Sequence, residues 1–275
     1  MHAMPTPRQL DQLELDAWAA FYDAAPAAFK LREGMACFAT ENGAGFTLRT
    51  CPFSFAGFNA VRLRPGVEPA ADTQISHGVD WARRHVQSMH SVEAFAPPGC
   101  ATRAQFAALG YAEKGRKAQF WRRNEPAPAA PSPIEIREID AATAADFAGV
   151  AAAVFGLPEH WQPWLIAAVG QPGWQVYVGY LNGAAVSCGA MFRQGEAAWL
   201  GWGATLPAHR GQGGQRALLA RRLQDGIAAG VQVFVIETGY PLGDEPLNGS
   251  HRNVVRAGFI LSHVRHLFAP AQCTG

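Results

Sequence analysis

A glycine-rich stretch between two arginines is the part of the sequence best suited to bind a ligand. It reads Arg210-Gly-Gln-Gly-Gly-Gln-Arg216 and lies between a run of β-forming residues and an amphipathic helical pattern. The first turn of a helix leaves its backbone N–H groups unpaired, and glycine lets the backbone approach a ligand closely. The helix dipole and the two arginines add positive charge. The stretch therefore predicts a pyrophosphate cradle formed by Arg210, Gly211, Gln212, Gly213, Gly214, Gln215 and Arg216.

Two common phosphate-binding motifs do not fit this stretch. No Gly-Lys-Ser/Thr follows, so it is not a Walker A loop. It follows the third strand of an expected meander and not the first strand of a βαβ unit, so it is not a dinucleotide fingerprint. A purely structural glycine-rich turn remains the alternative when the loop is considered alone.

The elements expected around the loop form a mixed α/β domain. Asn182-Gly183 joins two runs of β-forming residues, which is a strong hairpin signal. The expected strands are 134–139, 174–181, 184–193, 197–205, 231–237 and 259–268, and the expected helices are 141–155 after an Asp140 N-cap, 160–169, 214–229 closed by Gly230, and 250–257.

A proline-rich segment, 124–133, divides the chain into an N-terminal domain, 1–123, and a C-terminal domain, 134–275. Proline favours extended backbone, so we expect a semi-rigid linker there. In the first domain we expect helices at 10–24 and 79–87 and strands at 45–50 and 59–64. Ala108-Leu-Gly-Tyr111 echoes Arg256-Ala-Gly-Phe259, which favours an internal duplication. An unrelated helper domain is the alternative.

The composition narrows the classes of function. Charged residues make up 16% of the 275 residues and the formal net charge is +1, which argues against nucleic-acid binding. The five cysteines are scattered without metal-ligand spacing, so we expect no zinc site or disulfide framework. No signal peptide and no apolar run of roughly 20 residues is found, which favours a cytoplasmic protein that does not enter the membrane.

From residue 134 to residue 268 the sequence resembles the GNAT superfamily of N-acetyltransferases. Arg210-Gly-Gln-Gly-Gly-Gln215 matches that family's Arg/Gln-x-x-Gly-x-Gly/Ala signature except at Gln215, which we expect to point outward. Thr205-Leu-Pro, Ile236-Glu-Thr-Gly239 and Asn253-x-x-Arg-Ala-Gly-Phe259 resemble later motifs. The resemblance implies a mostly antiparallel sheet flanked by helices, and together with the internal echo it predicts two GNAT-like domains in tandem.

The resemblance also implies that acetyl-CoA is the cofactor. The fourth and fifth strands of the domain would splay apart, and pantetheine would lie in the cleft along Gly203, Ala204 and Thr205. Asn248 would contact pantetheine or cap a helix, and Asn253 would cap a helix or form a hydrogen bond in the core.

Acetyl transfer to an amine needs a base, a donor to the thioester carbonyl and an acid for the thiolate. We expect the backbone N–H groups of Gly203–Thr205, freed by the splay of the strands, to be the donor to the carbonyl. We expect Glu237, at the end of an apolar strand, to be the base, with burial raising its pKa; a solvated carboxylate at the end of the strand is the alternative. Many GNAT proteins carry a tyrosine where this chain has Val254, which has no proton to donate. Tyr240, His251 and a water molecule are the substitutes.

These residues predict an acetyl-CoA-dependent N-acetyltransferase acting on a small-molecule or peptide amine. A second hypothesis is an acyl-CoA sensor with little catalysis, which the missing tyrosine favours. The N-terminal domain has no Arg-x-x-Gly-x-Gly sequence in 60–80, so we expect one catalytic centre and a supporting role for this domain. Most tryptophans are expected in the core, although Trp202 could line an acceptor pocket. Oligomeric state is left open.

Overall fold

The structure is a computed structural model of the 275-residue chain. It describes residues 4–39, 46–50, 60–63, 66–67, 69–85 and 90–271, and it describes side chains in these ranges except at 36–39, 46–50 and 85. Parts of three elements expected in the N-terminal domain, at Gly45, Asn59, Arg64 and residues 86–87, lie outside the described residues.

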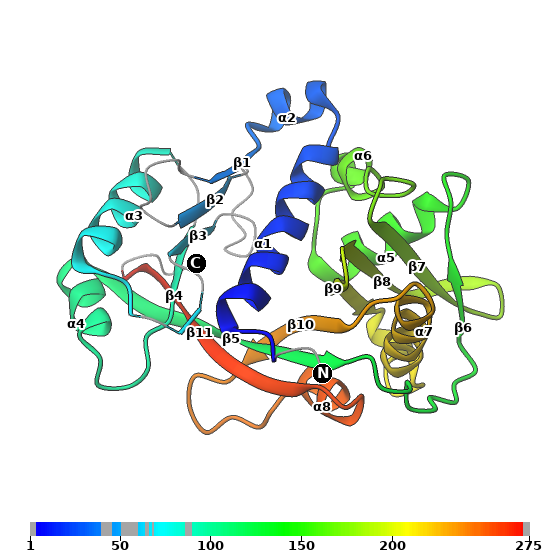
Figure 1. The fold of residues 1–275 in the computed structure, drawn as a ribbon. Helices are drawn as coiled ribbons and strands as arrows, with labels where there is room; N and C mark the ends of the chain where they lie inside the picture. Colours follow the sequence, from blue (N-terminus) through cyan, green and yellow to red (C-terminus); the bar gives the residue numbers. More distant parts are fainter. Residues whose placement is uncertain are drawn as a thin grey trace.

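A single sheet of eleven described strands runs through the molecule (Figure 1). Its order is β1-β2-β3-β4-β11-β5-β10-β9-β8-β7-β6. Only the β3–β4 and β9–β10 pairs are parallel among the described strands, so the sheet is mostly antiparallel. The strands are β1 Ala36–Ala39, β2 Phe46–Thr50, β3 Ala60–Leu63, β4 Ser91–Ala94, β5 Tyr111–Arg123, β6 Glu135–Glu138, β7 Trp174–Leu181, β8 Ala184–Gln194, β9 Ala197–Thr205, β10 Val233–Tyr240 and β11 Ile260–Pro270.

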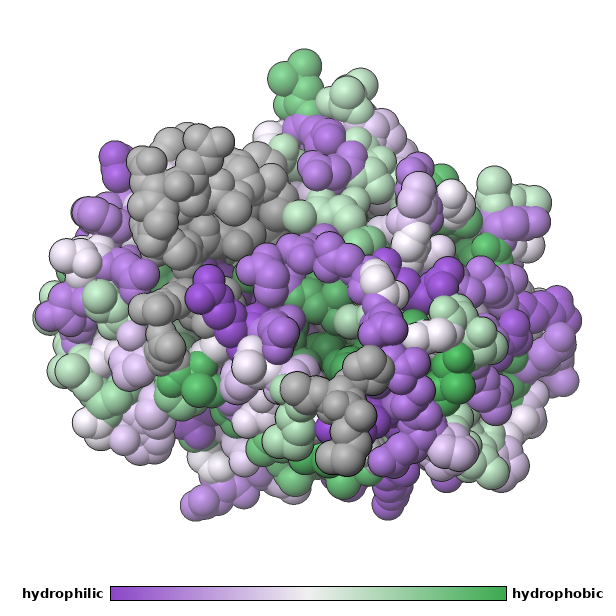
Figure 2. Space-filling view, viewed as in Figure 1, coloured by the Kyte–Doolittle hydropathy of each residue, from purple (hydrophilic) through white to green (hydrophobic). Residues whose placement is uncertain are grey.

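Helices cover both faces of the sheet. One apolar cluster joins α1, α5 and α6 to strands β7–β9, and another joins α7 and α8 to the opposite face. Hydrophilic side chains cover much of the surface shown in Figure 2, with hydrophobic ones in small groups between them. The helices are α1 Pro7–Ala24, α2 Ala27–Glu33, α3 Asp72–His85, α4 Ala101–Ala108, α5 Ala144–Phe155, α6 Gln162–Leu165, α7 Gly214–Ala228 and α8 Gly249–Arg256, with 3-10 turns at Glu159–Trp161 and Pro207–His209.

The two halves of the chain exchange their last strands. β5, the last strand of the N-terminal half, pairs with β10, while β11, the last strand of the C-terminal half, pairs with β4. β5 and β11 also pair with each other, and both run across the molecule in Figure 1. The halves are therefore interlocked within one sheet.

Each half repeats the same order of elements. A parallel strand pair is joined by one helix (β3-α3-β4 and β9-α7-β10), and then a second helix leads into the long last strand. Gly110 and Gly258 end these second helices with φ of +78° and +82°, a backbone conformation that favours glycine. The Gly-aromatic echo in the sequence therefore marks equivalent turns, and the predicted tandem architecture is confirmed.

Most elements predicted around the phosphate loop are confirmed, including the Asn182-Gly183 hairpin, but two predicted helix starts are wrong. The first C-terminal helix begins at Ala144, because Asp140 accepts hydrogen bonds from the N–H groups of Ala142 and Thr143 and caps a turn instead. The helix predicted at 160–169 is only α6, which starts at Gln162 because Pro163 has no N–H to continue a helix from His160.

The predicted domain boundaries stay predictions, although residues 124–133, the predicted linker, form neither helix nor strand. Ser132 in this segment donates a hydrogen bond to the Gln212 carbonyl at 2.8 Å, so the segment contacts the glycine-rich loop. No helix in the described part of the chain has the length and apolarity to span a bilayer.

Glu113 on β5 provides a test of how the halves are held together. Its carboxylate accepts from Arg103 of α4 at 2.7 Å and from Arg116 at 2.6 Å, and it lies 2.7 Å from Nδ1 of His266 on β11. Burial would raise the pKa of Glu113, but the hydrogen bonds from Arg116, Arg103 and His266 outweigh it and lower the pKa to about 2. Because the folded-state pKa is lowered, this stabilisation is present above the ordinary glutamate pKa and is lost as the pH falls towards 2.

We therefore expect Glu113→Gln to lower the free energy of unfolding at pH 7 by roughly 1–2 kcal/mol, with allowance for screening by water. Denaturant unfolding from pH 7 to pH 3 measures the effect, which should shrink as the pH falls. Glu135→Gln, which removes an exposed ion pair with Arg137, is the matched control and should change little. Equal effects of the two substitutions would contradict the prediction.

Candidate active site

The sheet opens between β9 and β10, as the resemblance implied for the fourth and fifth strands of the C-terminal half. The two strands pair only from Ala197–Leu200 to Val233–Ile236. Beyond that point β9 stays paired with β8 up to Thr205, whereas β10 stays paired with β5 up to Tyr240. Backbone groups on the facing edges of β9 and β10 are therefore left without a partner strand.

Two cavities meet at this opening. The larger, about 660 Å³, lies against the start of α7, and the smaller, about 460 Å³, lies between β9, β10, β5 and α1. Gly203, Gln215 and Ser250 line both cavities and so mark their junction. A ligand that extends from the larger cavity to the smaller must pass these three residues.

The larger cavity has the features of an anion site. None of the backbone N–H groups from Gly211 to Arg216 donates a hydrogen bond to an acceptor among the described residues, and no side chain caps α7. Gly213, the N-cap residue, has φ of +83°, which aligns the start of the helix at little steric cost. Three arginines, Arg210, Arg216 and Arg256, line the cavity together with His209, and no carboxylate of a described residue does. Unpaired amides, positive charge and space for a ligand fit a pyrophosphate.

The structure places nearly all the predicted cofactor-binding residues around the larger cavity. Gln212 is the exception, because its carbonyl is directed at Ser132 and it does not line either cavity. Arg256 and Ser132 were missed by sequence reasoning, although an arginine near the phosphate loop is a visible signal. The predicted residues that line the cavity are Gly203, Ala204, Thr205, Arg210, Gly211, Gly213, Gly214, Gln215, Arg216 and Asn248.

Gln215 does not point outward, as was expected from the sequence. Its Nε2 donates to Oγ of Ser250 at 2.9 Å, and its Oε1 accepts from Nδ2 of Asn253 at 2.9 Å. These bonds tie the first turn of α7 to α8. The pairing gives Asn253 the hydrogen-bonding role expected for it, and it identifies Ser250 as a junction residue that the sequence did not indicate.

Asn248 caps α8 and also lines the larger cavity. Its Oδ1 accepts from the His251 N–H at 2.8 Å, and its Nδ2 donates to the Gly239 carbonyl at 3.0 Å. The capping alternative is therefore observed, and a contact with pantetheine stays a prediction.

β9 contains a bulge where the two cavities meet. The register with β8 shifts by one residue between Cys188–Ala204 and Ala190–Gly201. Trp202 within the bulge has φ of +56°, an unusual conformation for a bulky residue, and it lines the smaller cavity. Bulges re-aim neighbouring backbone and side chains and often occur beside active sites.

Both halves of the chain build the smaller cavity. Trp18 comes from α1, and Gly115, Arg116 and Lys117 come from β5. Trp18 packs against Trp199 and Trp202, with ring centroids 5.8 Å and 5.7 Å apart. Phe155 at the end of α5 completes this aromatic wall. The N-terminal half therefore contributes residues to this cavity, and its predicted supporting role stays a prediction.

Glu237 lines the smaller cavity from the middle of β10. The prediction that it ends its strand is wrong, because β10 continues to Tyr240 through its pairing with β5. The side chain is 18% exposed, and its carboxylate pairs with Arg265 at 2.5 Å and with Lys117 at 3.4 Å.

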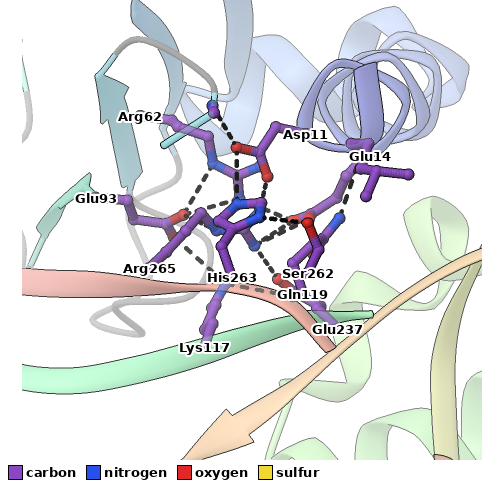
Figure 3. A network of polar contacts seen from close by, with 12 residues as sticks. Asp11, Glu14, Arg62, Glu93, Lys117, Gln119, Glu237, Ser262, His263 and Arg265 are labelled. Carbon is purple, nitrogen blue, oxygen red and sulfur yellow. Dashed lines mark hydrogen bonds and ion pairs between the residues drawn. The ribbon is translucent and has the colours of Figure 1, made fainter. Parts of the chain in front are cut away.

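A buried charged network has Glu237 at one end (Figure 3). It joins α1 to β3, β4, β5, β10 and β11, with Arg265 bridging Asp11 at 2.6 Å and Glu14 at 2.9 Å. Its carboxylates are Asp11, Glu14, Glu93 and Glu237, its permanent cations are Arg62, Lys117 and Arg265, and His263 lies 3.2 Å from Asp11.

The charge balance of this network bears on the pKa of Glu237. Four carboxylates face three permanent cations, so one carboxylate is not fully compensated. Burial and the nearby charge of Glu14 raise the pKa of Glu237, although Lys117 and Arg265 oppose the rise. A raised pKa is what the sequence led us to expect for a base.

The substitutes suggested for the missing tyrosine do not line either cavity. Val254 is fully buried on the face of α8 that packs into the core. The imidazole of His251 packs 5.0 Å from the ring of Phe120 and 5.8 Å from that of Tyr240, and burial lowers the pKa of His251. Ser250, one turn before Val254, is the hydroxyl that reaches the junction. No group of side chains with metal-binding composition occurs within the described ranges.

Comparison with solved structures identifies the fold. A GCN5-related N-acetyltransferase from Kribbella flavida aligns with 98% of this chain and 96% of its own, at a TM-score of 0.64 and 13% sequence identity. A second from Sphaerobacter thermophilus aligns over 96% and 93%, at a TM-score of 0.62 and 17% identity. A tandem GNAT protein from the clavulanic acid biosynthesis pathway aligns over 94% of each chain, at a TM-score of 0.53 and 16% identity. No protein-family model and no curated protein matches the sequence. The chain therefore has the GNAT fold in tandem form.

The glycine at the start of α7 gives a direct test of the anion cradle. We expect Gly213→Ala to weaken binding of coenzyme A at least tenfold, because a side chain at φ of +83° distorts the amides that would face the pyrophosphate. Gly230→Ala at the other end of α7 is the control, since its φ of +86° brings a similar strain of about 1–2 kcal/mol. Isothermal titration and thermal unfolding measure both variants; equal affinity in the two would contradict the prediction.

Proposed function

We propose that this protein transfers an acetyl group from acetyl-CoA to an amine that binds in the smaller cavity. The observation that carries the proposal is the meeting of two cavities at the break between β9 and β10, one with unpaired amides and arginines and the other with aromatic walls and a carboxylate. The GNAT fold of the structural neighbours supports the same reaction class.

The chain has the groups needed to hold coenzyme A. The amides from Gly211 to Arg216 and the side chains of Arg210 and Arg216 suit the pyrophosphate. The free edge of β9 from Gly203 to Thr205 suits an extended pantetheine arm, because its backbone groups have no partner strand beyond Leu200. Acetyl-CoA supplies an activated acetyl thioester.

The acceptor is an amine with an apolar or aromatic body. The smaller cavity is walled by Trp18, Phe155, Trp199 and Trp202, which favour a flat or hydrophobic group and attract a cation over their faces. A peptide amine with an apolar side chain and a small aromatic amine both meet this description.

Glu237 is the base in this proposal. In the reaction the amine nitrogen forms a bond to the acetyl carbon, the carbon–sulfur bond breaks, and the amine proton passes to Glu237. A raised pKa suits this role, because a carboxylate whose pKa lies nearer to neutral pH accepts a proton more readily.

Ser250 supports the departing thiolate. Its oxygen already accepts a hydrogen bond from Gln215, so its own O–H is free to donate into the junction. A hydrogen bond to a charged sulfur lowers the free energy of the leaving group without transferring a proton.

An acyl-CoA sensor with little catalysis is the second candidate. The buried Val254 and the pairing of Glu237 with Arg265 favour it, because the first removes the usual acid and the second weakens a base. Thiol release from acetyl-CoA across a panel of apolar and aromatic amines separates the two functions. Stabilisation by acetyl-CoA without any release would support the sensor and overturn the enzyme.

Replacing Glu237 tests its role as the base. Glu237→Gln should lower turnover about 10²–10⁴-fold. In the unmodified enzyme, turnover should fall as the pH drops through the raised pKa of Glu237, because protonation removes the base; the variant should lack this dependence. Glu93→Gln is the control, since it does not line the cavity; it should keep a fall in turnover at low pH, with a shifted midpoint because Glu93 shares Lys117 and Arg265 with Glu237. If both variants keep the same pH profile as the unmodified enzyme, Glu237 is not the base.

Replacing Ser250 tests support of the thiolate. Ser250→Ala should lower kcat about tenfold, the loss of a hydrogen bond worth about 1.5 kcal/mol to a charged group, with little change in KM for acetyl-CoA. Ser132→Ala should show the reverse pattern, because Ser132 holds the phosphate loop far from the thioester. Steady-state kinetics with the best amine of the panel measures both, and an unchanged kcat in Ser250→Ala removes this role.

A further inference from the structure

Arg222 on α7 is a cation buried beneath the bulge of β9. Arg222 is 1% exposed, and its side chain points from the helix into the sheet. Nε donates to the Leu218 carbonyl at 3.1 Å, and Nη1 donates to the carbonyls of Ala190 at 3.0 Å and Gly201 at 3.1 Å. These bonds hold β8 and β9 together where their register shifts.

No carboxylate pairs with Arg222 in the described part of the chain. The titratable groups beside it are Tyr177 and Cys188, and the pKa of each of these is itself raised, so both are uncharged near neutral pH. Burial lowers the pKa of Arg222 to about 10, which leaves it protonated at pH 7. A buried cation without a counter-charge costs several kcal/mol, which a role in ligand binding would explain.

The second terminal nitrogen of Arg222 is available at the junction. Nη2 donates to no acceptor among the described residues, and Arg222 lines the smaller cavity. Two glycines make room for the guanidinium: a Cβ at Gly189 would lie 3.1 Å from its central carbon, and a Cβ at Gly203 would lie 3.8 Å from Nη2. Gly203 lines both cavities, so Nη2 lies beside the place where a thioester would have to sit.

We propose that Nη2 of Arg222 donates a hydrogen bond to the carbonyl oxygen of the bound thioester. This inference rests on the proposed function. As the amine nitrogen bonds to the carbonyl carbon, negative charge develops on that oxygen, and the electron pair later leaves with sulfur when the carbon–sulfur bond breaks. Arg222 keeps its proton throughout and stabilises the charge through a preorganised donor in a site of low dielectric. The bonds of Nη1 to the Ala190 and Gly201 carbonyls account for a structural role in joining β8 and β9. The proposal assigns a separate role, in ligand binding, to Nη2.

The carbonyl carbon of acetyl-CoA reports this hydrogen bond without any acceptor amine. With acetyl-CoA labelled with ¹³C at the carbonyl, we expect the bound resonance to move downfield from that of free acetyl-CoA, because a donor to the oxygen polarises the bond. In Arg222→Met this displacement should shrink by more than half. Arg222→Lys keeps the charge but loses the forked donors, so its displacement should lie between those of the unmodified protein and Arg222→Met. Arg221→Met is the matched control, since Arg221 pairs with Asp225 and lines neither cavity.

Each outcome of this experiment has a definite meaning. A bound resonance without downfield displacement in the unmodified protein overturns the inference even if Arg222→Met fails to fold. Equal displacement in Arg222→Met and Arg221→Met also overturns it, while leaving acetyl-CoA binding and the proposed function intact. Absence of any binding of acetyl-CoA removes both. With an active amine, kcat should fall about 10²–10³-fold in Arg222→Met while KM for acetyl-CoA changes little; a rise in the KM of the amine alone would show that Arg222 binds the acceptor instead.

Discussion

The pairing of β10 with β5 is the constraint on which the rest of the site depends. β10 pairs with β5 along its whole length, from Val233 to Tyr240, but with β9 along only half of it. β5 can therefore hold β10 straight while β9 turns away with β8, and both cavities open into the gap. Because β5 belongs to the N-terminal half, the C-terminal half has no complete site without it. The exchange of last strands thus makes the N-terminal half a part of the smaller cavity.

Burying the charged network around Arg265 costs free energy of folding, and the position of the network suggests what it contributes in return. Burying several ionised groups is expensive, and replacing such groups with apolar ones often stabilises a protein. This network lies where α1, β5, β10 and β11 meet (Figure 3), and Glu237 and Lys117 are its members that line the smaller cavity. Charged partners from both halves thereby set the position and the pKa of one carboxylate at the site. Removing a partner would change the chemistry at Glu237 as well as the stability of the sheet.

The sequence predicted the C-terminal half well because its signals are local. An Asn-Gly turn, a glycine-rich loop and alternating strands can each be recognised within about ten residues. The start of α1 was missed by three residues although Thr6 and Gln9 form a capping box. The contributions of Trp18 and Lys117 to the smaller cavity could not be predicted, since they depend on a strand exchange between residues far apart in the chain. Ser250 and Arg222 were missed because neither residue type at its position signals a ligand without the surrounding geometry.

The junction of the two cavities differs from the family pattern in a coordinated way. Gln215 stands where a small residue is usual, and Val254 stands where a tyrosine is frequent, so each alone would argue for a degraded site. In the structure, however, Gln215 fills the junction and orients Ser250, one turn of α8 before Val254, towards it. On the sheet side, Gly189 and Gly203 leave the space that the Arg222 guanidinium occupies. Gln215, Ser250 and Arg222 each form hydrogen bonds with the protein and also line the cavity. Buried polar groups are costly to keep, so a site that had lost its function would have no need of them. The junction therefore favours the proposed transfer, carried out with different side chains, over a degraded site.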